Sequence, residues 1–470
     1  MSYSPVSCAP VSHLPVNHLP VSHLPVSMGA VMGLRVDARL RRFLRVALGA
    51  LLFVALPSWA QLTIQIQKGV DKPISIAVVP FGWNGPALPE DIAGIVGNDL
   101  KLSGQFAPLA PGNMLSMPHD PSELVYRDWR ALNVDWVVIG KIVPLQNGYT
   151  VQYELYDAIN QREALRGTEI GYNDSLRDVS HHIADRIYEK ITGIRGIFSL
   201  KLLYVSALRD EQGHTTYRLM LSDADGARER ILRTQREPLM TPSWAPDGET
   251  IAYTSFETHH PAIYIENLRT RARQQLTNFP GINSSPTFSP DGSKLAMVLS
   301  KDGNPEIYVM DLATRALTRL THHFAIDTEP SWTADGRSIL FTSDRGGRPQ
   351  IYRINATGGP VERLTFDGSY NARPRAMPDG SGFVYVHREH GDFHIVLRDT
   401  QRNITRPLTQ ASLDESPSIA PNSAMLIYAT LYGGRGILAA VSIDAGTRYL
   451  MPSRFGDVRE PSWSPFLDRR

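Results

Sequence analysis

The sequence predicts an α/β N-terminal domain followed by an all-β six-bladed propeller. A proline-led motif recurs six times between residues 242 and 465, at steps of 43 or 44 residues that are typical of propeller blades. Residues 61–195 instead mix short β-branched runs with amphipathic helical stretches. The 36 glycines and 34 prolines also favour many short strands joined by turns over a helical bundle.

Composition limits the functions open to this chain of 470 residues. With 42% hydrophobic and 20% charged residues, the chain is long and apolar enough for at least two folded domains. A formal net charge of +1 provides no basic field, so we expect no nucleic-acid partner. Cys8 is the single cysteine, which excludes disulfides within the chain and cysteine-based metal sites.

Residues 1–60 have the pattern of a leader that is removed. Residues 10–27 repeat a five-residue unit that cannot form a core, and we interpret them as dispensable rather than as a metal-binding histidine tract. A signal peptide cleaved after Ala60 is predicted. Arginines lie at 35–45, an apolar run follows at 46–56, and the small residues Ser58 and Ala60 stand at the positions that a signal peptidase reads. The apolar run is shorter than the ~20 residues of a membrane span, so we expect export to the periplasm rather than an uncleaved anchor.

Residues 61–195 predict the α/β domain. Strands are expected at residues 61–67, 74–81, 135–145, 149–158 and 165–171. Helices are expected at residues 90–102 and 175–192, with a further helix starting at Ser122. The last helix has one apolar stripe, and Gly193 is placed to end it.

Histidines provide the main metal-binding candidates. His181 and His182 are adjacent in the last predicted helix, where neighbours point about 100° apart and cannot share one ion, so we interpret both as solvated. His387, His390 and His394 are close in sequence and form the best candidate set, but a solvated or packing role is favoured. We therefore predict no metal site.

Residues 196–470 predict the propeller. Each repeat contains an anchor strand with a turn, an apolar strand, a strand centred on Ile-Tyr and a short strand before Leu-Thr, which makes one four-stranded blade. The anchors begin at Pro242, Pro286, Pro330, Pro374, Pro417 and Pro461. The aromatic residue of the anchor, such as Trp244 or Trp332, is expected to pack between neighbouring blades.

The two ends of this region predict how the ring closes. The last anchor has no further strands after it, whereas strands at 198–206, 216–221 and 229–233 have no anchor before them. Joined together they would complete the sixth blade and remove exposed sheet edges.

Polar residues stand just before every anchor. By six-fold repetition they must ring one mouth of the central channel, where a protein or peptide could dock. The alternative is that they are only solvated strand entries.

A rival function, a channel enzyme or small-ligand receptor, would need a cluster of acids at the mouth, and the candidates are Asp327, Glu329, Asp414 and Glu415. No nucleophile elbow, phosphate loop or dinucleotide motif is present in the sequence, and we predict neither catalytic residues nor a cofactor.

These features together resemble the TolB family, the periplasmic propeller proteins of the Tol-Pal system. The resemblance rests on the segment 61–71, the strand that ends at Phe81 and the six anchors of the Ser-Pro-Asp-Gly type. It implies an adaptor, peripheral to the outer membrane, that supports outer-membrane integrity and envelope constriction at cell division. Its expected partners are the peptidoglycan-associated lipoprotein Pal, the inner-membrane protein TolA and colicins that use the same mouth.

The resemblance also implies which residues bind each partner. The Pal contacts correspond to Ile282, Asn283, Ser285, Thr328, Glu329 and Pro330. Ile282 departs from the family pattern, because the best-known members have a histidine there. The TolA contacts correspond to Gln61, Leu62, Ile64, Ile66, Gly69, Val70 and Asp71. Glu329 is expected at the mouth with its carboxylate free for a partner's hydrogen-bond donors.

Overall fold

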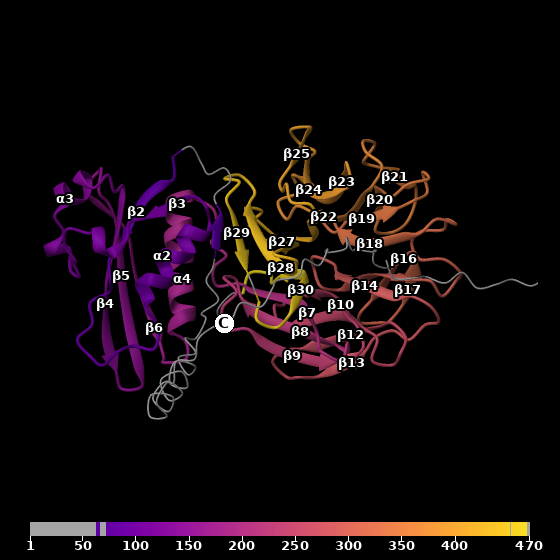
Figure 1. The fold of residues 1–470 in the computed structure, drawn as a ribbon, viewed down its shortest axis with the longest axis horizontal. Helices are drawn as coiled ribbons and strands as arrows, with labels where there is room; N and C mark the ends of the chain where they lie inside the picture. Colours follow the sequence, from indigo (N-terminus) through magenta and orange to yellow (C-terminus); the bar gives the residue numbers. More distant parts are fainter. Residues whose placement is uncertain (1–62, 66–71, 452, 468–470) are drawn as a thin grey trace, which may run out of the picture. The chain divides into compact units, whose positions relative to one another are not determined.

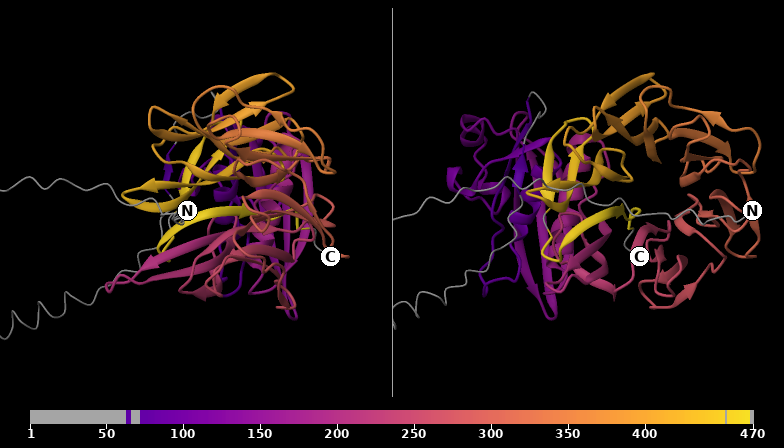
Figure 2. Two further views of the ribbon diagram at one scale, coloured as in Figure 1. Left: turned by 90° about the vertical axis from the view of Figure 1, so that its right-hand side faces the viewer. Right: turned by 45° about the vertical axis from the view of Figure 1, so that its right-hand side comes forward.

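The computed structural model describes residues 63–65, 72–451 and 453–467, and its strands form seven sheets. One sheet of five strands lies in the N-terminal α/β region, and the other six are blades that follow one another around a ring (Figures 1 and 2). The predicted fold class is therefore confirmed. The predicted leader and signal peptide lie outside the described residues. None of the described helices is long and apolar enough to cross a membrane.

The α/β region is built around a sheet with the strand order β3-β2-β4-β5-β6. Its strands are β2 (Ile74–Val78), β3 (Phe106–Pro108), β4 (Trp136–Leu145), β5 (Gly148–Asp157) and β6 (Arg162–Gly171). Helices α2 (Ile92–Leu102) and α4 (Leu176–Thr192) pack on one face, against Val138 and Leu155. The other face packs against Trp129, as expected when successive strand residues point to opposite sides.

The helix predicted to start at Ser122 begins at Tyr126 instead. Residues 121–131 form a short 3-10 turn, η3 (Pro121–Glu123), and then helix α3 (Tyr126–Ala131), with another turn, η2 (Pro111–Asn113), before them. Helix α4 follows its prediction closely. Gly193 ends it in the left-handed conformation, with φ of +74°, and donates its N–H to the carbonyl of Glu189.

Five blades are antiparallel and use strands in chain order from the channel outward. They are β10–β13 (Leu239–Trp244, Thr250–Ser255, Ala262–Asn267, Arg273–Gln275), β14–β17 (Asn283–Phe288, Lys294–Leu299, Glu306–Asp311, Leu317–Arg319), β18–β21 (Asp327–Trp332, Ser338–Ser343, Gln350–Asn355, Glu362–Arg363), β22–β25 (Asn371–Ala376, Gly382–Glu389, Asp392–Asp399, Ile404–Pro407) and β26–β29 (Glu415–Ile419, Met425–Tyr432, Arg435–Ser442, Arg448–Met451).

The sixth blade closes the ring as predicted. Strand β30 (Asp457–Trp463) pairs with β7 (Lys201–Arg209), which continues into β8 (Thr215–Asp223) and β9 (Arg230–Gln235). In Figure 1 the yellow C-terminal strand β30 lies beside the magenta strand β7. Two strands more than 240 residues apart in the sequence therefore share one sheet.

The anchor tryptophans link one blade to the next. The indole N–H of Trp332 donates to the carbonyl of Thr287 at 3.1 Å, and that of Trp244 donates to the carbonyl of Ser462 at 3.2 Å. Each acceptor belongs to the inner strand of the preceding blade. The prediction that these rings pack between blades is confirmed, because each ring also joins a hydrophobic cluster containing residues of the preceding blade.

The strand predicted at 61–67 belongs to a different sheet from the one expected, because the prediction placed it in the α/β domain. Strand β1 (Thr63–Gln65) pairs antiparallel with β29, placing Thr63 opposite Leu450 and Gln65 opposite Arg448. It is therefore a fifth strand on a propeller blade and not part of the α/β sheet. The physical reason is that β29 is an outer edge strand, which offers unpaired backbone groups to an extended segment.

Candidate functional site

The inner strands of all six blades line a central cavity of about 560 Å³. The residues that line it come mainly from the stretch around each anchor proline, for example Ser285 and Pro286 in β14 or Glu460 and Pro461 in β30. The ring of polar residues predicted from the repeat is thus partly present. Its members immediately before the prolines line the cavity, whereas earlier ones such as Asp327 and Asn371 are fully buried inside the blades.

A β-bulge in every inner strand aims one side chain at the channel. The pairing register shifts at this point in all six blades, and the residue before each anchor proline has φ between 49° and 57°. These residues are Thr241, Ser285, Glu329, Arg373, Ser416 and Glu460. A left-handed backbone conformation costs a residue with a side chain about 1–2 kcal/mol. Because all six inner strands adopt it at the same position, we infer that the bulge is required by the propeller architecture.

Five of the six predicted Pal residues line this cavity, namely Ile282, Ser285, Thr328, Glu329 and Pro330. Asn283 does not line it. Its side chain is fully buried, where its amide donates to the carbonyls of Phe279 and Gly281 and its oxygen accepts the N–H of Phe279. Asn283 therefore shapes the loop that carries Ile282 and does not offer its side chain at the cavity, and its predicted contact with Pal stays a prediction.

Glu329 lines the cavity, but its carboxylate is not free as expected. It forms an ion pair with Arg373 at 2.8 Å and accepts hydrogen bonds from the Thr342 hydroxyl at 2.8 Å and the Arg373 backbone N–H at 2.9 Å. Because Arg373 belongs to the next blade, Glu329 joins two blades at the channel wall. The sequence did not reveal this, since the repeat does not show which side chains of neighbouring blades meet.

Glu329→Gln is expected to lower the free energy of unfolding by about 1–3 kcal/mol, because it weakens hydrogen bonds that involve a charged, largely buried carboxylate. Chemical denaturation measures the change. The control is Glu362→Gln, which alters the exposed ion pair of Glu362 with Arg353 and should change stability by less than about 1 kcal/mol. Equal effects of the two substitutions would show that Glu329 does not hold the blades together.

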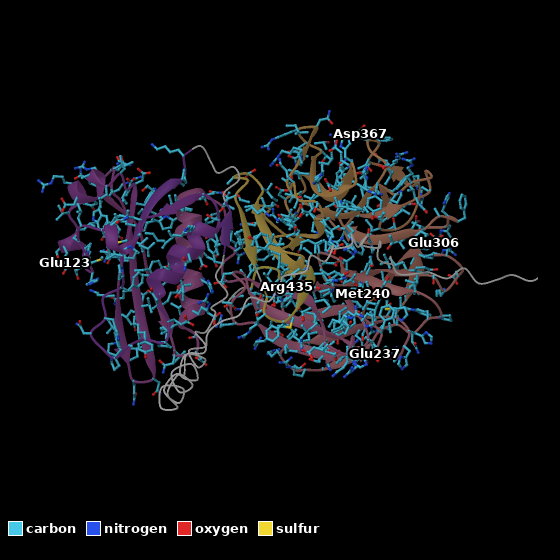
Figure 3. The ribbon with its side chains drawn as sticks, in the orientation of Figure 1. Glu123, Glu237, Met240, Glu306, Asp367 and Arg435 are labelled. Atoms are coloured by element: carbon cyan, nitrogen blue, oxygen red, sulfur yellow. The ribbon has the colours of Figure 1, made fainter. Side chains whose placement is uncertain are left out.

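Large apolar side chains border part of the mouth. They stand at or just before the start of an inner strand, and these positions all lie at one end of the channel because the inner strands run in the same direction around the ring. The exposed side chains are Met240 (labelled in Figure 3), Ile282, Phe324, Ile326 and Phe366. Phe324 is 88% exposed and Phe366 is 70% exposed, so this rim offers an apolar surface that a partner could cover.

The acids required by the rival function do not converge. Of Asp327, Glu329, Asp414 and Glu415, only Glu329 lines the cavity. Asp327 is fully buried and paired with Arg345 at 2.6 Å, and burial raises the pKa of Asp327. Asp414 is also fully buried and accepts the N–H of Ala411. The mouth therefore resembles a docking surface more than a site for acid-base or metal chemistry.

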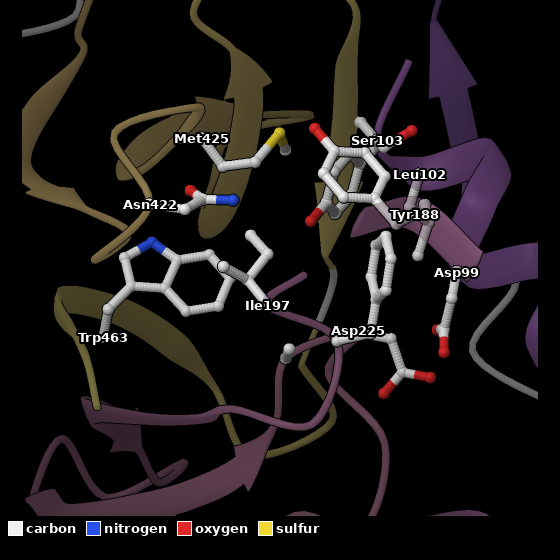
Figure 4. Close-up of a pocket in the computed structure, with 12 residues that line it drawn as sticks. Asp99, Leu102, Ser103, Tyr188, Ile197, Asp225, Asn422, Met425 and Trp463 are labelled. Atoms are coloured by element: carbon white, nitrogen blue, oxygen red, sulfur yellow. The ribbon is translucent and has the colours of Figure 1, made fainter. Parts of the chain in front are cut away.

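A buried charge cluster joins the α/β region to the sixth blade. The interpretation of His181 as solvated is wrong, because its side chain is buried and its Nδ1 lies 2.6 Å from the carboxylate of Asp99. Its Nε2 lies 3.6 Å from Asp223. Figure 4 shows Asp99 and Asp225 beside Tyr188, in a pocket that Ile197 and Trp463 also line.

Electrostatics favour a charged His181. Burial alone would lower the pKa of His181, but the carboxylates of Asp99 and Asp223 outweigh it and raise this pKa to about 10. Burial raises the pKa of Asp99 to about 7, and attraction to His181 opposes the shift.

His181, Asp223 and Asp225 lie close enough to be metal ligands, yet Lys201 and Arg228 pair with Asp223 at 2.8 and 2.7 Å. These cations disfavour a metal ion.

The other histidine candidates do not assemble a site either. The Nδ1 of His387 lies 2.7 Å from the Asn371 side-chain oxygen, where it supports the inner strand of its blade. His394 lies opposite His387 in the neighbouring strand, whereas the side chain of His390 is 91% exposed at the hairpin.

Comparisons with known proteins agree over nearly the whole described chain. Residues 62–164 match the family model of the TolB amino-terminal domain, and residues 188–467 match that of the TolB beta propeller domain. The Tol-Pal system protein TolB of Pseudomonas aeruginosa is 56% identical over 428 residues, which cover 90% of this chain and 99% of the relative.

Two further relatives extend this similarity. The Tol-Pal system protein TolB of Pseudomonas putida is 59% identical over 408 residues, which cover 86% of this chain and 94% of the relative. The crystal structure of TolB from Acinetobacter baumannii is similar with a TM-score of 0.79 and 40% identity, over 86% of this chain and 100% of that chain.

Proposed function

The chain belongs to the TolB family of the Tol-Pal system, and on this premise we propose that it is a periplasmic adaptor that binds the lipoprotein Pal at its propeller mouth. It acts through partners and not through turnover of a substrate. By holding Pal, it is peripheral to the outer membrane and supports envelope integrity and constriction at cell division.

The observation that carries the Pal proposal is the composition of the mouth. Exposed apolar side chains border part of the mouth of a polar channel, and protein interfaces commonly combine apolar contacts with hydrogen-bonding groups. Ile282 belongs to both features, since its side chain is 38% exposed and also lines the cavity. We therefore assign Ile282 a central contact, with Ser285, Thr328 and Pro330 supplying the adjacent wall.

Glu329 has a revised role in this proposal. Its carboxylate is already paired with Arg373, so it presents a fixed acceptor rather than a mobile one to Pal. A preorganised group loses less conformational entropy on binding, which favours specificity for a donor placed at one position.

TolA binding through residues 61–71 remains a prediction. Of the predicted contacts, only Ile64 falls in the described chain, where its backbone pairs with β29. Gln61, Leu62, Ile66, Gly69, Val70 and Asp71 lie outside the described residues. Colicin binding at the mouth is likewise part of the proposal.

Ile282→Glu is expected to weaken binding of the soluble domain of Pal by about 1–3 kcal/mol, because a charge replaces an apolar contact at the mouth. Titration calorimetry measures the affinity, and a thermal melt checks that the variant folds. The control is Ile404→Glu, at an exposed apolar residue that begins β25, on the end of the blade away from the mouth. The proposal fails if Ile282→Glu binds Pal like the unsubstituted chain, or if both variants weaken binding equally.

A further inference from the structure

A second ring of residues lines the channel, at the position that follows each anchor proline. Its members are Ser243, Thr287, Ser331, Arg375, Ser418 and Ser462, and all six line the central cavity. Five of the blades thus place a hydroxyl at this level, and the β22 blade places an arginine there. Docking of a partner at the mouth does not explain why one position of this ring, Arg375, carries a positive charge.

Arg375 has no carboxylate partner in the described chain. Of its donors, one N–H bonds to the carbonyl of Pro374 at 2.8 Å, and none of the ion pairs found among the described residues includes Arg375. A guanidinium has five N–H donors, so most of its donor capacity remains available. Burial lowers the pKa of Arg375, yet an arginine side chain stays charged in proteins.

The acids nearest this level are already engaged. Glu329 is paired with Arg373, and Glu460 accepts a short hydrogen bond from the backbone N–H of Thr241. Both belong to the ring formed by the bulges, one level away from the ring of Arg375. Neither lies within ion-pair distance of Arg375 in the described structure.

The hydroxyls of Ser331 and Ser418, from the blades on either side of Arg375, each accept one backbone N–H. Ser331 accepts the N–H of Ala376 at 3.1 Å, and Ser418 accepts the N–H of Trp463 at 3.1 Å. Each hydroxyl keeps its own O–H donor, and that hydrogen has no acceptor among the described residues. Two O–H donors and a guanidinium therefore line the same cavity, and such donors are what an oxyanion requires.

We propose that the channel contains an oxyanion-binding site, with Arg375 as its cation and the hydroxyls of Ser331 and Ser418 as its flanking donors. Its ligand is a small group with charged oxygens, either a phosphate ion or a carboxylate. The site lies in the wall of the same cavity that the proposed Pal contacts line, and it needs no partner protein to form.

The test is thermal unfolding of the full chain in sodium phosphate or sodium acetate, each compared with sodium chloride at equal ionic strength. Binding to the folded state should raise the melting temperature in a saturable way. Arg375→Ser gives this blade the residue found in four of the others. It should raise at least about tenfold the anion concentration that is needed for half of the full rise in melting temperature. A response to phosphate or to acetate identifies which ion the site prefers.

Arg435→Ser is the matched control, because Arg435 is exposed in the hairpin that joins β27 and β28 (Figure 3). It should keep the full response to the anion. If Arg375→Ser does not fold, Arg375→Gln takes its place. The proposal is overturned if neither anion gives a saturable rise, or if the variant at Arg375 responds like the unsubstituted chain.

Discussion

Deleting residues 460–470 is expected to unfold the whole propeller. The deletion removes the part of β30 in which Ser462 pairs with Leu203 and Trp463 pairs with Leu202. It also removes the Trp463 ring, which is only 6% exposed and packs with Met425 and Ile427 of the neighbouring blade. Loss of one such ring costs about 3–5 kcal/mol, and loss of the strand adds an open sheet edge on β7.

This loss approaches the roughly 5–15 kcal/mol that stabilises an ordinary domain. Limited proteolysis and calorimetry of the truncated chain measure the effect. Trp463→Ala isolates the packing contribution, and Phe324→Ala is its control, because Phe324 is 88% exposed and its removal should change stability by less than about 0.5 kcal/mol. A truncated chain with the melting temperature of the intact one would show that β30 does not close the ring.

His181→Gln is expected to lower the free energy of unfolding by about 3–5 kcal/mol at pH 7, because it removes the cation of a buried pair and leaves Asp99 either to carry an uncompensated charge or to take up a proton. Denaturant titration measures the loss. The neighbouring residue provides the control: His182 is 32% exposed and pairs with Glu169 at 3.2 Å, so His182→Gln should cost less than about 1 kcal/mol. Equal costs would mean that the junction does not depend on the buried pair.

The effect of pH on this pair has a definite sign. The pKa of His181 rises from 6.5 to about 10 on folding, so its stabilisation is complete below pH 6.5 and is lost as the pH rises through 10. The pKa of Asp99 rises from 3.8 to about 7, so folding favours its protonated form and stability also falls as the pH rises through 7. The cost of His181→Gln should therefore shrink between pH 7 and pH 10, as the unsubstituted chain loses its charged histidine.

The repeat and its closure could be predicted from sequence because both depend on spacing. Anchors such as Pro242 and Pro461 recur at a fixed step, and unmatched strands at the two ends leave one way to complete the sixth blade. The Asp-Gly turns also follow from local chemistry, since Gly248 adopts φ of +69° where a residue with a Cβ would be strained.

What the sequence did not predict depends on contacts between distant segments. His181 looked solvated because it lies outside the apolar stripe of α4, whereas Asp99 and Asp223, which approach it, come from other elements. Asn283 and Glu329 looked available because the repeat shows where a residue lies along a strand and not what its side chain meets. Strand β1 found its partner on β29 because an edge strand accepts any suitable extended segment.

The central claim is that the propeller mouth is the docking surface for Pal. Hydrogen–deuterium exchange of the full chain, with and without a saturating soluble domain of Pal, tests it most directly. Slower exchange is expected in residues 279–285 and 322–330, which carry Ile282 and Phe324, while helices α2 and α4 keep their rates. Protection confined to the α/β region, with the mouth unchanged, would contradict the account.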